Sequence, residues 1–343
     1  MEKINIAING FGRIGRSIFK IINDFKFINI KFINDINPSL DNLIYLLKYD
    51  STYGTFKKKI ENYDDYFIIN KSKTRYFSEK NINKLFDKAG SVDILIDSTG
   101  INIKKKIYQN IIKKKQTKKV IITQSSDQSD REVVMGFNEN KLEKTDAIIS
   151  SSICDANAII HILSIFDEHF GIKSGSVTTV HPWLSYQNLV DGSSISQSNP
   201  NIFWKDYALG RSSSNNLIPK NTTAIQACEK IKPNLKNKLL SFSYRVPTEI
   251  VSSSDITLFL EKNIKKDQID QIIKNIEKKK FLEVNYESLV SRDFIKNESS
   301  AIIDYRWIKI KNNIVKIVLW YDNEWGYSNR VVDLIKFIYK KFI

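Results

Sequence analysis

At 343 residues the chain is longer than one hydrophobic core usually serves, so the sequence predicts two domains. A hydrophobic fraction of 42% suffices for packed cores, and no apolar run is long enough to cross a bilayer, which argues against an integral membrane protein. Two cysteines argue against a disulfide framework and cannot supply a zinc site of the usual spacing, so no metal site is expected.

The formal net charge is +15, and lysines cluster at 57–59, 104–106 and 278–280. Such a charge attracts nucleic acid, membrane surfaces or small anions without selecting among them. Because the clusters are scattered and lack interleaved aromatic residues, a solvated surface is the preferred interpretation, with RNA binding as the alternative. The sequence opens on a strand-like segment and not on a charged, cleavable leader, so a soluble cytoplasmic protein is expected.

A glycine-rich turn follows the first expected strand, which covers 4–8. Glycines permit a tight turn, close approach of the backbone to a pyrophosphate, and close packing of a helix on the strand. A second expected strand, 28–33, is followed by Asp35, whose carboxylate suits the adenosine ribose and repels the additional phosphate of NADP. The sequence therefore predicts a dinucleotide site that prefers NAD to NADP. Its expected residues are Gly10, Phe11, Gly12, Arg13, Ile14, Gly15 and Asp35.

The segment 41–86 mixes helix and strand patterns and allows no firm assignment. Strand patterns return at 92–97 and 119–123, with a lysine-rich helix expected between them at about 103–116. Short apolar runs separated by helices predict a parallel sheet whose strand ends direct loops toward the cofactor.

Cys154 precedes an apolar helical run, 158–166, and the helix is expected to stop at Phe170. A thiol at a helix N-terminus faces unpaired backbone N–H groups and the positive end of the helix dipole, which favour the thiolate. This placement suits a nucleophile. A small buried residue in a strand-to-helix turn is the ordinary alternative.

His181 ends the next expected strand, 175–180, whereas packing or capping explains His161 and His169 in the cysteine helix. Histidine exchanges protons near neutral pH, so His181 is a candidate acid or base. The segment 183–216 is polar and irregular, and a segment of that length is usually functional. The remaining pattern indicates an α+β domain with a mostly antiparallel or mixed sheet. Its expected strands are 239–247, 254–260 and 313–320, and its expected helices are 223–230, 266–278 and the terminal 329–342.

Together these motifs resemble the glyceraldehyde-3-phosphate dehydrogenase family, which includes the erythrose-4-phosphate dehydrogenases. The resemblance spans nearly the whole chain, and its segments occur in the family's order. They are Ile8-Asn9-Gly10-Phe11-Gly12-Arg13-Ile14-Gly15-Arg16, Ile33-Asn34-Asp35, Ser98-Thr99-Gly100, Cys154 with Asn157, Thr178-Thr179-Val180-His181, Tyr244-Arg245-Val246-Pro247-Thr248, and Trp320-Tyr321-Asp322-Asn323-Glu324-Trp325-Gly326-Tyr327-Ser328-Asn329-Arg330.

The resemblance implies a Rossmann-type α/β domain for NAD at 1–153, completed by 322–343, and a catalytic domain at 154–321. It implies that Cys154 adds to an aldehyde to give a thiohemiacetal, that His181 takes the proton, and that hydride transfer to the nicotinamide leaves a thioester. We expect His181 to lower the pKa of the thiol. A homotetramer is also implied. The further residues implied are Thr99, Thr123 and Asn323 for the cofactor, and Thr222 and Arg245 for the substrate anion.

The sequence departs from the family where phosphate binds. The family has hydroxyl residues on both sides of the cysteine, and this chain has Ile153 and Asp155 there. The family threonine three residues after the catalytic histidine is replaced by Leu184, and the family glycine that follows the phosphate-binding threonine is replaced by Thr223. A carboxylate there should repel phosphate and oppose the thiolate, although a first-turn acid complementing the helix dipole is an ordinary feature. NAD-specific members of the family carry Asp-Gly-Pro in one loop, where this chain has Asp191-Gly192-Ser193. The replaced proline weakens the predicted preference for NAD.

Three hypotheses follow. The leading one is NAD-dependent oxidation of glyceraldehyde 3-phosphate, a step of glycolysis, with inorganic phosphate as acceptor. The second keeps the cysteine chemistry on another sugar or a non-phosphorylated aldehyde, with water releasing the thioester. The third is a non-catalytic protein that binds NAD or RNA.

Overall fold

The computed structural model describes residues 3–196 and 203–343. Its contacts divide the chain into two compact units. The N-terminal unit comprises Met1–Ile153 and Tyr327–Ile343, and the central unit comprises Cys154–Gly326.

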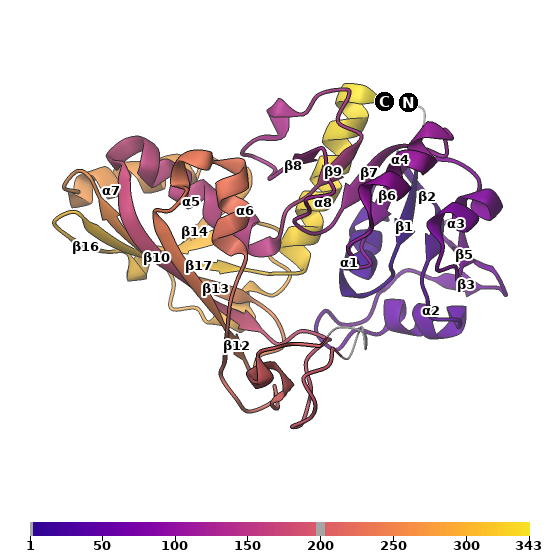
Figure 1. The fold of residues 1–343 in the computed structure, drawn as a ribbon, viewed down its shortest axis with the longest axis horizontal. Helices are drawn as coiled ribbons and strands as arrows, with labels where there is room; N and C mark the ends of the chain where they lie inside the picture. The colour runs from indigo at the N-terminus through magenta and orange to yellow at the C-terminus, as the bar shows by residue number, and fades with distance from the viewer. Residues whose placement is uncertain (1–2, 197–202) are drawn as a thin grey trace. The chain divides into compact units, whose positions relative to one another are not determined.

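The N-terminal unit is built on one twisted sheet, in the strand order β3-β4-β5-β2-β1-β6-β7-β9-β8 (Figure 1). Strand β1 pairs in parallel with β2 on one side and with β6 on the other, so the direction of winding reverses beside β1. In a doubly wound sheet that reversal leaves room for a ligand at the carboxyl ends of the strands. The strands are β1 (Ile4–Asn9), β2 (Ile28–Asn34), β3 (Ile60–Asn62), β4 (Tyr66–Ile69), β5 (Ser72–Phe77), β6 (Val92–Asp97), β7 (Thr117–Ile122), β8 (Arg131–Glu132) and β9 (Ile148–Ser150).

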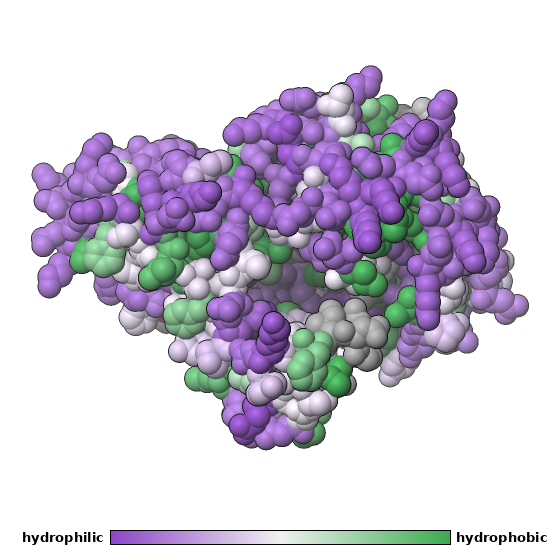
Figure 2. All heavy atoms as spheres, in the orientation of Figure 1, coloured by the Kyte–Doolittle hydropathy of each residue, from purple (hydrophilic) through white to green (hydrophobic). Residues whose placement is uncertain are grey.

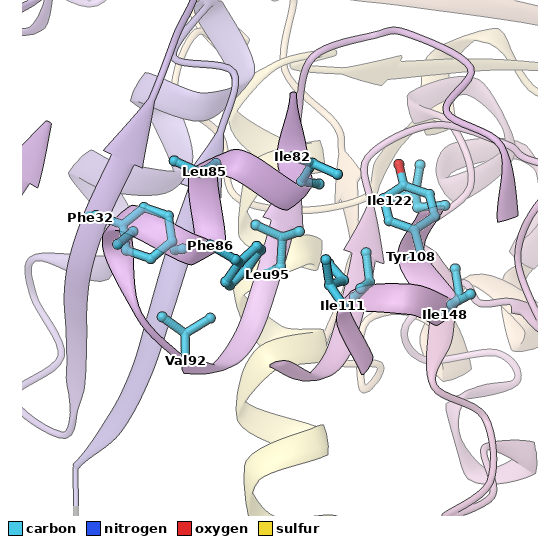
Figure 3. Packing of buried hydrophobic residues seen from close by; sticks show 13 residues of the cluster. Phe32, Ile82, Leu85, Phe86, Val92, Leu95, Tyr108, Ile111, Ile122 and Ile148 are labelled. Carbon is cyan, nitrogen blue, oxygen red and sulfur yellow. The ribbon is translucent and has the colours of Figure 1, made fainter. Parts of the chain in front are cut away.

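Helices cover both faces of this sheet. Apolar side chains on one face pack against α3 and α4, among them Phe32, Leu95 and Ile122, and Phe86 and Tyr108 come from the helices (Figure 3). The helices α1 and α8 lie on the other face (Figure 1). The helices of the unit are α1 (Arg13–Ile22), α2 (Leu40–Lys48), α3 (Ile82–Ala89), α4 (Lys105–Lys113), the 3₁₀ turn η1 (Glu139–Lys141) and most of α8 (Trp325–Phe342).

The segment that the sequence left unassigned contains helix α2 and a β4–β5 hairpin. The two residues of the hairpin turn, Asn70 and Lys71, both have a positive φ, at 50° and 65°. This backbone matches the twist of a two-residue hairpin, but the sequence lacks the Asn-Gly pair that usually signals it. Ser39 caps α2 by accepting from the Asn42 N–H, which fixes where that helix begins.

The central unit contains a mixed sheet in the order β11-β12-β10-β13-β17-β15-β14, with β16 paired to β17. Helices α5, α6 and α7 contact the same side of it (Figure 1). The predicted α+β class with a mixed sheet is confirmed. The strands are β10 (Ile172–Pro182), β11 (Ile218–Lys220), β12 (Leu239–Val246), β13 (Ser252–Leu260), β14 (Leu282–Asn285), β15 (Ala301–Asp304), β16 (Lys309–Lys311) and β17 (Ile314–Tyr321). The helices are α5 (Cys154–Phe170), α6 (Ala224–Ile231), α7 (Lys266–Ile276) and the 3₁₀ turns η2 (Tyr207–Gly210), η3 (Pro233–Leu235), η4 (Ser291–Phe294) and η5 (Tyr305–Trp307).

Two differences from the sequence prediction concern short or capped elements. The terminal helix begins at Trp325, four residues before the predicted start, because Asp322 Oδ1 accepts the N–H groups of Glu324 and Trp325 and caps its first turn. The strands β11, β14, β15 and β16 have three or four residues each, too few for a clear alternation pattern. Part of the segment 183–216 lies outside the described residues.

No helix in the described part of the chain has the length and apolar character needed to span a membrane. The face drawn in Figure 2 is mostly hydrophilic, with hydrophobic residues lying between hydrophilic ones.

Candidate functional site

The candidate nucleophile and base lie together at one end of the central sheet. Cys154 is the first residue of α5, and His181 is next to last in β10. Cys154 Sγ lies 3.8 Å from His181 Nε2. This separation is at the outer limit for a hydrogen bond to sulfur, and it places the imidazole where it can accept the thiol proton.

The tautomer of His181 follows from its other ring nitrogen. Nδ1 lies 2.8 Å from the carbonyl oxygen of Pro182. Since a carbonyl oxygen only accepts, Nδ1 carries the hydrogen, and the lone pair of Nε2 is directed to the thiol. Burial lowers the pKa of His181 to about 4, and the positive charge of Arg245 contributes to the lowering. The imidazole is therefore neutral at pH 7 and available as a base.

The thiol is not preformed as a thiolate. Burial raises the pKa of Cys154 well above its ordinary value, and the adjacent charge of Asp155 raises it further, against a smaller lowering by Arg245. The expectation that the pKa of Cys154 is lowered is wrong, because burial and Asp155 raise it and because the neutral imidazole brings no positive charge. The expectation that Asp155 opposes the thiolate is confirmed.

Asp155 is buried and faces the nucleophile. Its Oδ1 accepts from Cys154 Sγ at 3.5 Å and from the hydroxyl of Tyr321 at 2.8 Å. Tyr321 in turn lies 3.3 Å from Ser254 Oγ, and burial together with Asp155 raises the pKa of the tyrosine. The reactive atoms of Cys154, Asp155 and His181 all lie within 4.8 Å of one another. Asp155 is thus in the first helical turn and also in direct contact with the thiol.

A strained turn leads the chain into α5. Ser152 has a φ of 56°, a left-handed conformation that is uncommon for residues other than glycine. Its N–H donates to Ser150 Oγ, its Oγ donates to Glu132 Oε1 at 2.6 Å, and its carbonyl accepts from Tyr327 OH at 3.0 Å. These bonds hold the turn that determines where the helix begins.

Arg245 lies beside His181 in the sheet. The two residues are paired in register between the parallel strands β12 and β10. Only 8% of Arg245 is exposed, and its Nη2 donates to Tyr186 OH at 3.4 Å. Thr222, the other predicted anion ligand, lies just before α6, where its Oγ1 accepts the N–H of Ala224 at 3.2 Å. The structure therefore brings Cys154, His181 and Arg245 together.

The glycine-rich turn has a backbone that excludes side chains at two positions. Gly10 has a φ of +90°, and a Cβ there would lie 2.6 Å from the carbonyl carbon of Ser98. A Cβ on Gly15 would lie 2.2 Å from the Gly10 oxygen. The N–H of Phe11 donates to Asp35 Oδ2 at 2.7 Å, so the acid after β2 lies against this turn. The N-cap of α1 is Gly12, and no side chain of the described residues caps this helix.

The other predicted cofactor residues of the N-terminal unit follow neighbouring strands. Thr99 Oγ1 donates to the buried Asp97 Oδ1 at 2.7 Å, and the Thr123 N–H donates to the Asp97 carbonyl at 2.9 Å. Arg13 is paired with Asp50 at 3.0 Å. Burial would raise the pKa of Asp50, but Arg13 and Lys20 contribute to holding it at about 2.

In the central unit, Asn323 lies two residues after the end of β17 at Tyr321 and is 6% exposed. Its Oδ1 has no hydrogen-bond partner among the described residues. A buried acceptor without a donor is costly, and an amide N–H₂ group would satisfy it. The cradle at Gly10 and Gly15 fits a pyrophosphate, and separately the acceptor of Asn323 fits an amide such as the carboxamide of nicotinamide.

Comparison with known proteins finds matches to one enzyme family over almost the whole chain. Residues 4–105 match the glyceraldehyde 3-phosphate dehydrogenase NAD-binding domain, and residues 153–323 match the C-terminal domain of that enzyme. Glyceraldehyde-3-phosphate dehydrogenase of Buchnera aphidicola subsp. Schizaphis graminum is 37% identical over 341 residues, covering 98% of each chain. The chain belongs to the glyceraldehyde-3-phosphate dehydrogenase family.

Other members of the family are similar to the same extent. Glyceraldehyde-3-phosphate dehydrogenase 1 of Kluyveromyces marxianus is 39% identical, covering 98% of this chain and 99% of its own. The cytosolic glyceraldehyde-3-phosphate dehydrogenase of Chlamydomonas reinhardtii is 37% identical, covering 99% and 98%. The predicted family and the predicted NAD-binding domain are confirmed.

The sequence did not predict the contacts that several residues make around this site. Tyr321 and Tyr327 stand in the motif that carried the resemblance, yet nothing in the motif indicates that their hydroxyls contact Asp155 and Ser152. Leu184, one of the departures, contributes a backbone N–H to Gln187 Oε1 at 3.0 Å. Asp191 accepts from the Ser212 N–H at 2.8 Å and pairs with Arg211, so it helps fix the irregular segment.

Proposed function

We propose that the chain is an NAD-dependent dehydrogenase that oxidises glyceraldehyde 3-phosphate through a thioester on Cys154, with His181 as base. The observation that carries the proposal is the Cys154–His181 pair, with 3.8 Å between Sγ and the lone-pair nitrogen Nε2. The names of the relatives support the same substrate.

The dyad supports two proton transfers. His181 Nε2 first accepts the thiol proton as sulfur bonds to the aldehyde carbon, and the protonated imidazole returns it to the carbonyl oxygen, giving a thiohemiacetal. Nε2 then removes the hydroxyl proton as a hydride leaves the same carbon, and the thioester remains. Because the imidazole is neutral and the thiol protonated at rest, we propose that the nucleophile is generated only when substrate is present.

NAD is the cofactor that the site fits. Gly10, Gly12 and Gly15 would admit the pyrophosphate, Phe11, Arg13, Ile14, Thr99 and Thr123 would line the site, and Asn323 would accept from the carboxamide. When bound, NAD supplies the hydride acceptor. Asp35 supports a preference for NAD over NADP: two of its lone pairs accept the N–H groups of Phe11 and Asn37, others can accept ribose hydroxyls, and its charge repels a 2′-phosphate.

A second candidate function is favoured by Asp155. Its buried carboxylate stands where family members bind phosphate with a hydroxyl, and Ile153 and Leu184 remove further polar groups. On this alternative, a related sugar or a non-phosphorylated aldehyde is oxidised and water releases the acid. Dependence of turnover on added inorganic phosphate separates the two.

Residues 1–153 with 322–343 would form the nucleotide domain and 154–321 the catalytic domain of a cytoplasmic homotetramer. Exposed apolar side chains support subunit contacts on the central unit, since Leu189, Val190 and Leu240 are 69%, 72% and 78% exposed. Sedimentation equilibrium tests this assembly, and a monomer at micromolar concentration would contradict it.

The decisive assay measures NADH formation by purified protein with NAD, glyceraldehyde 3-phosphate and inorganic phosphate. We expect turnover that is lost in Cys154→Ser and accompanied by an acyl adduct on Cys154 when phosphate is omitted. Absence of both NADH and adduct with any small aldehyde would refute the proposed function. Replacing NAD by NADP in the same assay tests the cofactor preference. In Asp35→Asn, the activity with NAD should exceed the activity with NADP by a smaller factor than in the wild type.

A further inference from the structure

Two cationic side chains share one face of the central sheet beside the nucleophile. Strand β11 pairs antiparallel with β12, with Ile218 opposite Arg245 and Lys220 opposite Ser243. Paired residues share a face and side chains alternate along a strand, so Lys220 and Arg245 point to the same side as diagonal neighbours. His181 is on that side too, because it is paired with Arg245 across β10 and β12.

Neither cation has a carboxylate partner in the described part of the chain. Arg245 is more than nine-tenths buried, and among the described residues its guanidinium donates to the Tyr186 hydroxyl while its Nε has no partner. Lys220 is half-buried, and its ammonium group forms no ion pair or hydrogen bond among the described residues. Desolvation lowers the pKa of Lys220, and Arg245 lowers it further against the opposing effects of Tyr186 and Asp155. Buried cations are normally paired, so this arrangement favours an anion.

Unpaired hydroxyls lie on the same face. Thr179 and Ser243 are neighbours in register, both are buried, and neither Oγ has a partner among the described residues. Hydroxyl, ammonium and guanidinium groups are the donors that hold a phosphate, which has three acceptor oxygens. The cluster therefore matches a phosphate dianion better than a carboxylate or an apolar ligand.

We propose that Lys220 is a phosphate-binding residue that acts beside Arg245 and offsets the repulsion of Asp155. The proposal rests on the proposed function, since it identifies the substrate class of the same site. Lys220 and Arg245 together carry two positive charges, against the single negative charge of Asp155. The site therefore accepts phosphate although position 155 lacks the hydroxyl that the family has there. The phosphate is either the ester group of the aldehyde or the inorganic ion that attacks the thioester.

The test compares Lys220→Met with Lys220→Arg and with Lys236→Met, which removes an exposed lysine elsewhere in the central unit. For each variant, kcat and KM are measured with glyceraldehyde 3-phosphate, with non-phosphorylated glyceraldehyde, and with inorganic phosphate varied. A hydrogen bond from a charged group contributes enough binding free energy that its loss in Lys220→Met should raise a KM by about tenfold or more. The KM affected is the one for glyceraldehyde 3-phosphate or the one for inorganic phosphate. We expect little change with glyceraldehyde, near-wild-type behaviour in Lys220→Arg, and none of these effects in Lys236→Met.

The outcomes distinguish the sources of phosphate. A raised KM for glyceraldehyde 3-phosphate assigns Lys220 to the ester, and a raised KM for inorganic phosphate assigns it to the acceptor. Equal loss with phosphorylated and non-phosphorylated aldehydes, or no change in either, overturns the proposal. If Lys220→Met does not fold, Lys220→Gln takes its place. If wild type gives no NADH, the proposed function fails, and equilibrium dialysis of inorganic phosphate against wild type and Lys220→Met still tests Lys220: weaker binding by the variant supports it, and equal binding refutes it.

Discussion

Burial and the charge of Asp155 both keep the thiol of Cys154 protonated, and replacing Asp155 by Asn should remove the second of these effects. The substitution keeps the size of the side chain and removes one negative charge at 3.5 Å from Cys154 Sγ. At that distance two unit charges interact by about 1.2 kcal/mol in water and about 4.7 kcal/mol at an effective dielectric constant of ~20. One pKa unit corresponds to about 1.4 kcal/mol, so the pKa of Cys154 should fall by roughly one to three units.

The assay is the rate of iodoacetamide alkylation against pH, read at the Cys154 peptide by mass spectrometry so that the buried Cys228 does not contribute. The midpoint reports the thiol pKa directly. Tyr321→Phe is the matched control, because it removes the hydrogen bond to Asp155 and leaves the charge. We expect no fall in the midpoint for that variant. A midpoint that is unchanged or higher in Asp155→Asn would refute the electrostatic reasoning.

The other predictions concern the base, the glycine turn and the core. The neutral imidazole of His181 is the base, and its pKa is about 4. As the pH is lowered, kcat/KM should therefore stay constant through pH 6.5 and be lost only near pH 4. A decline near pH 6.5, the ordinary pKa of histidine, would contradict this. His181→Asn should reduce kcat by about 10²–10⁴-fold with little change in the melting temperature. Gly10→Ala, which places a Cβ 2.6 Å from the Ser98 backbone at a positive φ, should weaken NAD binding in calorimetry and destabilise the fold by about 1–3 kcal/mol. Leu95→Ala should reduce the free energy of unfolding in urea by about 2–5 kcal/mol, because Leu95 is fully buried.

Much of the fold could be predicted because its elements are long or carry turn signals. The first strand, the glycine turn and α1 are adjacent in sequence, and each has its own pattern. The start of the dinucleotide-binding unit could therefore be predicted to within a few residues. The β4–β5 hairpin was missed because Asn70 and Lys71 adopt positive φ without a glycine. Tertiary pairing stabilises that turn, and no local propensity indicates it.

The candidate site was predictable in its residues but not in its charge balance. Cys154 and His181 could be paired from the sequence, whereas the sign of the thiol's pKa shift depends on burial, which the sequence does not display. Lys220 illustrates the same limit. Nothing near it in sequence marks it as a ligand, and only the register of β11 on β12 places it on the face of Arg245 and His181.

The imidazole of His181 is oriented by a group that no side-chain substitution can delete. Its Nδ1–H donates to the carbonyl of the next residue, Pro182, where a catalytic triad would use a carboxylate. A residue before proline is confined to extended backbone, so the strand and the proline together fix the geometry of this dipeptide. A carbonyl is uncharged and stabilises the imidazolium less than an acid would. The imidazole of His181 therefore holds a proton less strongly than the imidazole of a carboxylate-paired triad would.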